Sequence, residues 1–247
     1  MFASGTEKKL SDKPVETQTG YVLALHMNLL DEDLRRVAGQ RLADRIAAND
    51  GRLGTGFLGT PYLLAALTDV GHVDIAYRLL QSTEYPSWGY LVDHGATTMW
   101  ERWNGDQMRG DPSMNSYNHY AYGAVADWIY RYAAGIDTLP DDPGFHTILL
   151  HPNFDRRLGS LDFSYESVYG TIRSAWSISG DLVTWNLTVP PNTKGELPVS
   201  ADQVGSFKLD GRPLAKSGRI HFLRQADGNA WYEVPAGKYE FTTTLAE

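Results

Sequence analysis

The chain changes character once along its length, and this change limits the folds open to it. Residues from about 18 to 136 carry apolar side chains at helical spacing, whereas residues from about 145 to 245 alternate apolar and polar side chains as strands do. The segment Leu139-Pro140-Asp141-Asp142-Pro143-Gly144 lies between them, and its two prolines and glycine cannot continue a helix. The sequence therefore predicts a multidomain protein, with a helical domain over residues 1–139 and a β domain over residues 140–247.

The first part is expected to hold five helices. Four of them span residues 18–30, 61–70, 73–83 and 115–136. The fifth opens on Asp31-Glu32-Asp33, whose negative charges suit the positive N-terminal end of a helix, and it ends at Asn49-Asp50-Gly51. Most of these helices are apolar on a broad face, which indicates part of a larger helical array. Between the helices predicted over residues 73–83 and 115–136, residues 85–105 are expected to form a long irregular segment.

The second part is expected to form short strands. Alternating segments cover residues 161–165, 171–178, 182–189 and 239–245, and residues 207–214 are predicted to form a strand and a turn. Ser179-Gly180-Asp181 is typical of a hairpin turn between the second and third of these segments. About eight short strands at regular spacing predict an antiparallel β-sandwich.

The composition excludes several classes of function. The 22 basic and 30 acidic residues give a net charge of -8, which argues against a nucleic-acid partner. The chain has no cysteine, so disulfides, thiolate metal sites and cysteine nucleophiles are excluded. The histidines show no metal-ligand spacing, so neither a metal nor a cofactor is expected. No membrane span and no signal peptide are recognised, which predicts a cytoplasmic protein.

The stretch Trp100-Glu101-Arg102-Trp103 is the strongest candidate for chemistry. Loops on a helical scaffold are where functional sites commonly lie. A carboxylate flanked by indoles, as Glu101 is, can be partly desolvated, and this makes a carboxylate a better base. The alternative is a surface glutamate paired with Arg102 or Arg109.

A polar row follows at the start of the last predicted helix. Asn115, Asn118, His119 and Tyr122 are three or four residues apart, so on a helix they would share one face. Such a row could donate hydrogen bonds to sugar hydroxyls, and this makes Asn118 and His119 candidate substrate-binding residues. The alternative is that these side chains form hydrogen bonds with backbone groups at the start of the helix.

Four motifs occur in a fixed order along the helical part. They are residues 55–61 (TGFLGTP), 85–90 (YPSWGY), 95–103 (GATTMWERW) and 113–120 (SMNSYNHY). Together they resemble the C-terminal part of bacterial α-L-rhamnosidases of glycoside hydrolase family 78. The resemblance runs from about Gln18 through the C-terminal strands, where it lies mainly in the placement and pattern of the strands.

The resemblance implies a fold, a reaction and site residues. It implies part of an (α/α)6 barrel followed by a β-sandwich, and inverting hydrolysis of terminal α-L-rhamnosides. The general base of the family falls on Glu101, and the histidine that contacts the sugar falls on His119. Trp88, Trp100 and Trp103 are expected to form walls of the sugar pocket, and rhamnose-containing glycosides are the expected partners.

The sequence also departs from the family. The general-acid motif, of the type Asp-Glu-Arg-x-Gly-Trp-Thr-Gly-Asp, does not occur in these 247 residues. No motif supports Asp93, Asp106 or Asp111 as a replacement. The chain is therefore expected to be truncated and to show little or no activity alone. Two alternatives are a non-catalytic rhamnose-binding remnant, and a fragment that functions with a chain carrying the first half of the barrel.

Overall fold

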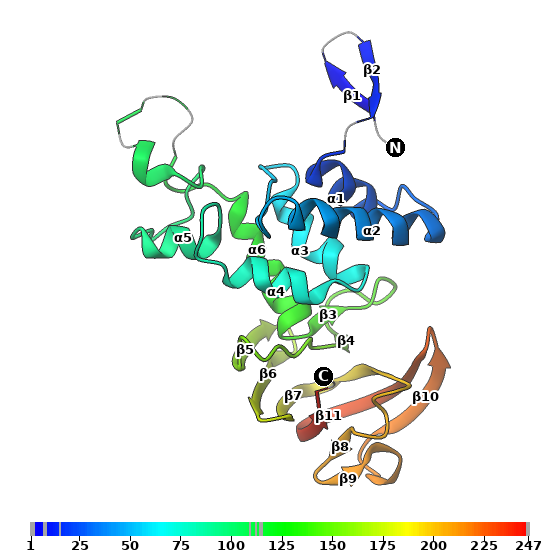
Figure 1. Cartoon of the computed structure of the whole chain (residues 1–247). Helices are drawn as coiled ribbons and strands as arrows, with labels where there is room; N and C mark the ends of the chain where they lie inside the picture. Colours follow the sequence, from blue (N-terminus) through cyan, green and yellow to red (C-terminus); the bar gives the residue numbers. More distant parts are fainter. Residues whose placement is uncertain are drawn as a thin grey trace. The chain divides into compact units, whose positions relative to one another are not determined.

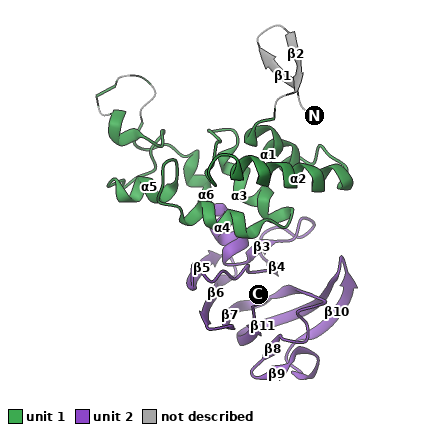
Figure 2. Ribbon diagram, viewed as in Figure 1, with its two compact units in different colours: residues 1–126 green, residues 127–247 purple. Residues whose placement is uncertain are grey.

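The computed structural model describes residues 16–108, 110, 111, 113 and 116–245, together with the backbone of residues 3–6 and 9–14. The chain divides into two compact units, residues 1–126 and residues 127–247 (Figure 2). Helices dominate the first unit and a sheet dominates the second (Figure 1), so the predicted order of helices and then strands is confirmed. The placement of a domain boundary between residues 139 and 140 stays a prediction.

The first unit is built mainly from short helices. It begins with β1 (Ala3–Thr6) and β2 (Lys9–Pro14), and its helices are α1 (Gln18–His26), α2 (Glu32–Ala47), α3 (Thr60–Asp69), α4 (Val73–Gln81), α5 (Trp88–Asp93) and the 3-10 helix η1 (Gly105–Met108). One further helical stretch continues into the second unit through η2 (Tyr122–Ala124), α6 (Val125–Trp128) and the π-helical turn η3 (Ile129–Ala133). Within the described residues, none of the helices is long and apolar enough to cross a membrane.

Local sequence explains where the predicted helices start and stop. The carboxylate of Asp31 accepts a hydrogen bond from the backbone N–H of Leu34 at 3.0 Å, and this N-cap begins α2. Leu42 and Ile46 lie one turn apart on α2 and are buried. The helix predicted over residues 18–30 is shorter, because Asn28 adopts a left-handed φ of 54° just after α1 ends.

The helices α1, α2 and α3 pack on one another, and α3 also packs on α4. The buried side chain of Gln18 ties the start of α1 to the loop that precedes α3. Its amide nitrogen donates to the carbonyl of Arg52 at 3.1 Å, and its amide oxygen accepts from the backbone N–H of Gly54 at 2.6 Å. This clamp positions the following loop, residues 55–59, beside α1.

The prediction of a helix over residues 115–136 is wrong for the first part of this range. Helical structure starts only at Tyr122, and residues 116–121 are irregular. Their backbone groups pair with another segment: the N–H of Glu101 donates to the carbonyl of Ser116 at 2.9 Å, and the N–H of His119 donates to the carbonyl of Met99 at 2.8 Å. Backbone groups used in this way cannot form helical bonds. Asn118, His119 and Tyr122 therefore do not share a helix face.

Asn115, expected in the polar row, and Arg109, a possible partner of Glu101, lie outside the described residues. The segment predicted to be irregular contains α5, which Ser87 begins by accepting a hydrogen bond from the N–H of Tyr90 at 3.0 Å. The prediction missed α5 because a single N-cap and a six-residue helix leave little periodicity in the sequence.

The change from helix to strand occurs at Gly135. This residue has a left-handed φ of 68°, and a Cβ there would lie 2.1 Å from the backbone nitrogen of Pro152. Only glycine suits this position. The strands β3 (Ile136–Thr138) and β4 (Thr147–Leu150) follow and pair antiparallel, so the proline-rich segment 139–144 lies in the connection between two strands.

The second unit is a mixed sheet of nine strands, within the part of the chain that the structure describes. After β3 and β4, its strands are β5 (Ser160–Ser167), β6 (Gly170–Ser179), β7 (Leu182–Ser200), β8 (Lys208–Leu209), β9 (Arg212–Pro213), β10 (His221–Ala226) and β11 (Asn229–Thr244), and the 3-10 helix η4 (Leu214–Lys216) follows β9. The hairpin predicted at residues 179–181 joins β6 to β7 and is confirmed.

The long strand β7 explains the shape of this sheet. Its first half pairs with β6 and its second half with β4, while β11 follows it antiparallel along nearly its whole length. A strand with different neighbours on its two halves lets the sheet divide into sandwich-like layers. The pairing of β4 with β7 is parallel, so the sheet departs from the predicted antiparallel pairing at this one pair of strands.

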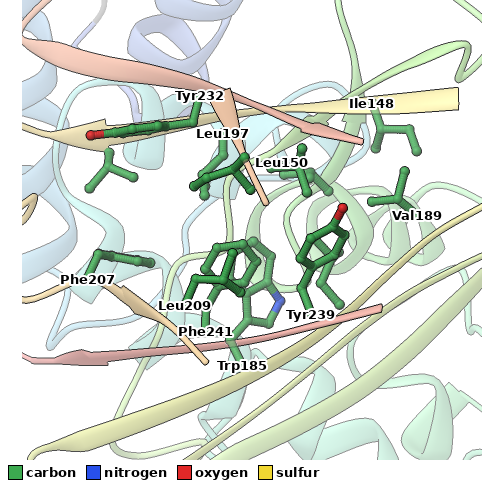
Figure 3. Close-up of a cluster of buried hydrophobic side chains, with 14 of the residues drawn as sticks. Ile148, Leu150, Trp185, Val189, Leu197, Phe207, Leu209, Tyr232, Tyr239 and Phe241 are labelled. Atoms are coloured by element: carbon green, nitrogen blue, oxygen red, sulfur yellow. The ribbon is translucent and has the colours of Figure 1, made fainter. Parts of the chain in front are cut away.

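The core of the second unit lies among the inward-facing residues of β4, β7 and β11 (Figure 3). Trp185 and Phe241 stack with their ring centroids 5.0 Å apart, and both are almost fully buried. Figure 3 shows Leu150, Leu197 and Tyr232 in the same cluster. The core therefore joins strands that are distant in sequence.

Candidate active site

Glu101 is buried, with 8% of its surface exposed. Its backbone N–H donates to the carbonyl of Ser116 at 2.9 Å, and its carboxylate oxygen Oε2 accepts from the backbone N–H of Ser116 at 2.7 Å. This reciprocal pair fixes the direction of the carboxylate. The alternative of a surface glutamate does not hold.

A continuous set of rings, which includes Trp103 two residues after Glu101, joins four segments of the first unit. Trp103 stacks on Tyr122 with centroids 3.9 Å apart and planes 10° apart, and Trp88 meets Trp103 edge-on at 5.4 Å. The ring centroid of Phe57 lies 5.6 Å from that of Tyr122 and 4.7 Å from that of His119. The structure thus brings three of the predicted site residues, Trp88, Trp103 and His119, into one aromatic cluster.

The two buried indoles of this cluster differ in their hydrogen bonds. The Nε1–H of Trp88 donates to the carbonyl of Tyr122 at 2.8 Å. The Nε1 of Trp103 is buried and has no hydrogen-bond partner among the described residues. A buried donor without a partner is costly, and such a group in a native structure commonly faces a ligand or water. Trp103 is therefore a candidate donor to a bound sugar.

A pocket of about 350 Å³ lies beside Trp100. It is lined by Gly95, Thr97, Thr98, Trp100, Gly110 and Tyr117. Tyr117 meets Trp100 edge-on at 5.9 Å, and its hydroxyl donates to the carbonyl of Gly105 at 2.9 Å. Asn118, the remaining predicted site residue, is exposed on the adjoining irregular segment.

The predicted site residues did not include Phe57 or Ser116. Phe57 belongs to one of the four motifs, but nothing in the sequence shows that its ring reaches His119. Ser116 acts through its backbone N–H, which carries no side-chain signal. Only the position of the Thr55–Pro61 motif ahead of a helix could have drawn attention to Phe57.

Three other carboxylates lie near Glu101 in the sequence, at positions 93, 106 and 111. Asp93 is exposed at the end of α5, and Asp106 accepts a hydrogen bond from the Tyr90 hydroxyl at 3.3 Å. Hydrogen bonds from the side chain and backbone of Ser113 lower the pKa of Asp111, and Arg102 acts in the same direction. An aspartate held ionised in this way is poorly suited to donate a proton.

No group of three or more histidine, cysteine, aspartate or glutamate side chains arranged to hold a metal ion occurs among the residues described.

Tyr122 gives a testable pH dependence. Burial raises the pKa of its hydroxyl from 10.0 to about 12, and Tyr85 and Glu101 act in the same direction. As pH rises through this window, the unfolded chain loses the proton before the folded chain does, so we expect the free energy of unfolding to fall. Urea unfolding at several pH values should show a smaller fall for Tyr122→Phe, which keeps the ring. Identical pH profiles for the unsubstituted chain and Tyr122→Phe would contradict the raised pKa of Tyr122.

Comparison with known families agrees with the two-unit architecture. The model of the bacterial α-L-rhamnosidase six-hairpin glycosidase domain matches residues 8–133. The model of the bacterial α-L-rhamnosidase C-terminal domain matches residues 135–211. The helices therefore match the six-hairpin glycosidase domain of these proteins, and the sheet matches their C-terminal domain.

Curated relatives match nearly the whole chain. An α-L-rhamnosidase of Streptomyces avermitilis is 42% identical over 232 residues, which are 92% of this chain and 21% of that protein. One from Formosa agariphila is 37% identical over 91% of this chain and 24% of that protein. The chain thus spans between a fifth and a quarter of the length of these relatives. It belongs to the bacterial α-L-rhamnosidase family.

Solved structures support the same fold. The crystal structure of the Streptomyces avermitilis α-L-rhamnosidase complexed with L-rhamnose matches 93% of this chain and 22% of that chain, with 40% identity and a TM-score of 0.79. The α-L-rhamnosidase of Aspergillus terreus matches 94% of this chain and 24% of its own, with 29% identity and a TM-score of 0.76. The predicted fold class is confirmed.

Proposed function

We propose that this chain supplies the general base and part of the sugar-binding wall of an inverting α-L-rhamnosidase site. The observation that carries the proposal is the burial of Glu101 with one carboxylate oxygen held by the Ser116 N–H. A general base must present its carboxylate in one direction toward a water molecule. His119, Asn118 and the indoles Trp88, Trp100 and Trp103 are proposed to form the part of the site that receives rhamnose.

The chemistry needs two carboxyl groups. In an inverting glycosidase one group protonates the leaving oxygen while the other activates water, and the two lie about 6.5–9.5 Å apart. Glu101 is proposed for the second task. The lowered pKa of Asp111 argues against it for the first task, and no motif in the sequence marks another acid. We therefore propose that the isolated chain hydrolyses rhamnosides weakly or not at all.

An assay of the purified chain with p-nitrophenyl α-L-rhamnoside, beside Glu101→Gln, tests this proposal. Loss of the general acid commonly costs about 10²–10⁴-fold, so the rate should fall at least about 100-fold below that of a typical glycosidase. A typical glycosidase rate that the substitution abolishes would show that these 247 residues contain an unrecognised acid. A typical rate that the substitution leaves unchanged would remove Glu101 from the role of base.

Binding of rhamnose without cleavage is a second candidate function. The buried Trp103 Nε1 without a partner favours it, because a sugar hydroxyl could accept its hydrogen bond. Calorimetry should then detect heat when L-rhamnose is added, and Trp103→Phe should weaken that binding. No heat up to millimolar concentrations of L-rhamnose would count against this function.

A chain that carries the first half of the barrel is the partner proposed for full activity. The observation that favours it is an apolar surface on α2 and on the turn that precedes it. Met27, Leu29, Leu34 and Val37 are each more than half exposed there. Soluble proteins rarely leave such surfaces uncovered.

A further inference from the structure

We propose that Phe57 is a positioning residue that holds the imidazole of His119 for sugar binding. This inference rests on the proposed function, in which His119 contacts rhamnose. Phe57 belongs to the Thr55–Pro61 motif, which has no role in the proposed function. It joins the cluster from outside the 85–122 segment that contains the other site residues.

The rings around His119 restrict its orientation. Phe57 stacks on the imidazole with centroids 4.7 Å apart and planes 23° apart. Tyr120 also stacks on it, at 5.3 Å and 9°, but 86% of Tyr120 is exposed. Phe57 is better buried and also contacts Tyr122, which stacks on Trp103. The firmer of the two stacking contacts on His119 is therefore the one from Phe57.

A backbone contact selects the nitrogen that His119 can offer to a ligand. The Nδ1 atom accepts a hydrogen bond from the N–H of Ala121 at 3.3 Å. In the neutral imidazole the proton then lies on Nε2, which is a donor suited to a sugar hydroxyl. Stacking by Phe57 sets the plane of the ring, and the Ala121 contact sets its tautomer. Together they determine the direction in which Nε2–H points.

The loop that carries Phe57 is itself held in place. The hydroxyls of Thr55 and Thr60 lie 2.8 Å apart, and the Thr60 hydroxyl also donates to the carbonyl of Thr55 at 3.1 Å. Gly59 packs so closely that a Cβ there would lie 2.8 Å from the Thr19 Oγ1. A loop closed in this way can hold the Phe57 ring at a constant place.

The test uses the full chain and L-rhamnose as the probe. Imidazole proton NMR, with His119→Gln to assign the signal, follows His119 in the chain and in variants Phe57→Leu, Phe57→Met and Phe57→Tyr. Phe222→Leu is the matched control, because Phe222 is 60% exposed and lies on β10 in the other unit. Two variants that lack a ring guard against one of them failing to fold.

We expect Phe57→Leu and Phe57→Met to shift the His119 signal and to weaken L-rhamnose binding about three- to tenfold, the range for losing one aromatic pair. Phe57→Tyr should restore both readouts, and Phe222→Leu should change neither. A chain that binds L-rhamnose equally well with Leu at position 57 would overturn this inference and leave the proposed function intact. If the unsubstituted chain does not bind L-rhamnose, the proposed rhamnose-binding role of its residues fails, and this inference fails with it.

Discussion

Mixing this chain with the part of the Streptomyces avermitilis relative that it does not match is expected to raise rhamnoside hydrolysis at least about 100-fold over either part alone. The physical reason is that the reaction needs an acid and a base on opposite sides of the glycosidic bond. Glu101 of this chain is proposed as the base, and the relative that the chain resembles is several times longer. Hydrolysis of p-nitrophenyl α-L-rhamnoside measures the gain.

Two substitutions make this experiment specific. Glu101→Gln should remove the gain while leaving the association of the two parts intact. Leu34→Lys should remove the association, because a charge would replace an apolar side chain on the exposed surface of α2. Leu182→Lys is the matched control, since Leu182 is about equally exposed but lies on β7 in the other unit. Parts that co-elute on size exclusion without any gain in rate would contradict the prediction.

Trp185→Ala is expected to lower the free energy of unfolding of the second unit by about 3–5 kcal/mol, the range for removing a large buried aromatic ring. Trp185 is 1% exposed and stacks on Phe241 (Figure 3). Its Nε1–H also donates to the hydroxyl of Ser174 at 2.9 Å, and Ser174 is fully buried. The substitution therefore leaves a cavity and also removes a buried hydrogen bond.

Urea unfolding followed by far-ultraviolet circular dichroism measures this effect. Leu182→Ala is the control on the same strand, because Leu182 is 48% exposed and its truncation should change the free energy of unfolding by less than about 0.5 kcal/mol. An effect of Trp185→Ala as small as that of the control would mean that the core does not depend on this ring.

The sequence predicted the order of elements well where each element carries its own signal. The acidic start Asp31-Glu32-Asp33 and the stop at Asn49-Asp50-Gly51 located α2. Alternation located β6 and β7, and Ser179-Gly180-Asp181 located the hairpin between them. These signals are local, because capping, periodicity and turn chemistry act within a few residues.

The predictions failed where distant segments compete for the same backbone. Residues 116–121 have a helical pattern, but their backbone pairs with residues 99–101 instead. The parallel pairing of β4 with β7 also joins strands that are far apart in the chain. Periodicity within one segment contains no information about either partner.

The same division applies to the candidate site. The sequence by itself determined that Glu101 lies between two indoles and that a helical part precedes a β part, because these facts depend on residue order alone. Only the tertiary structure decided that Ser116 holds the carboxylate and that Phe57 stacks on His119. These contacts join residues 15 and 62 positions apart, and only the packing of the folded chain brings such residues together.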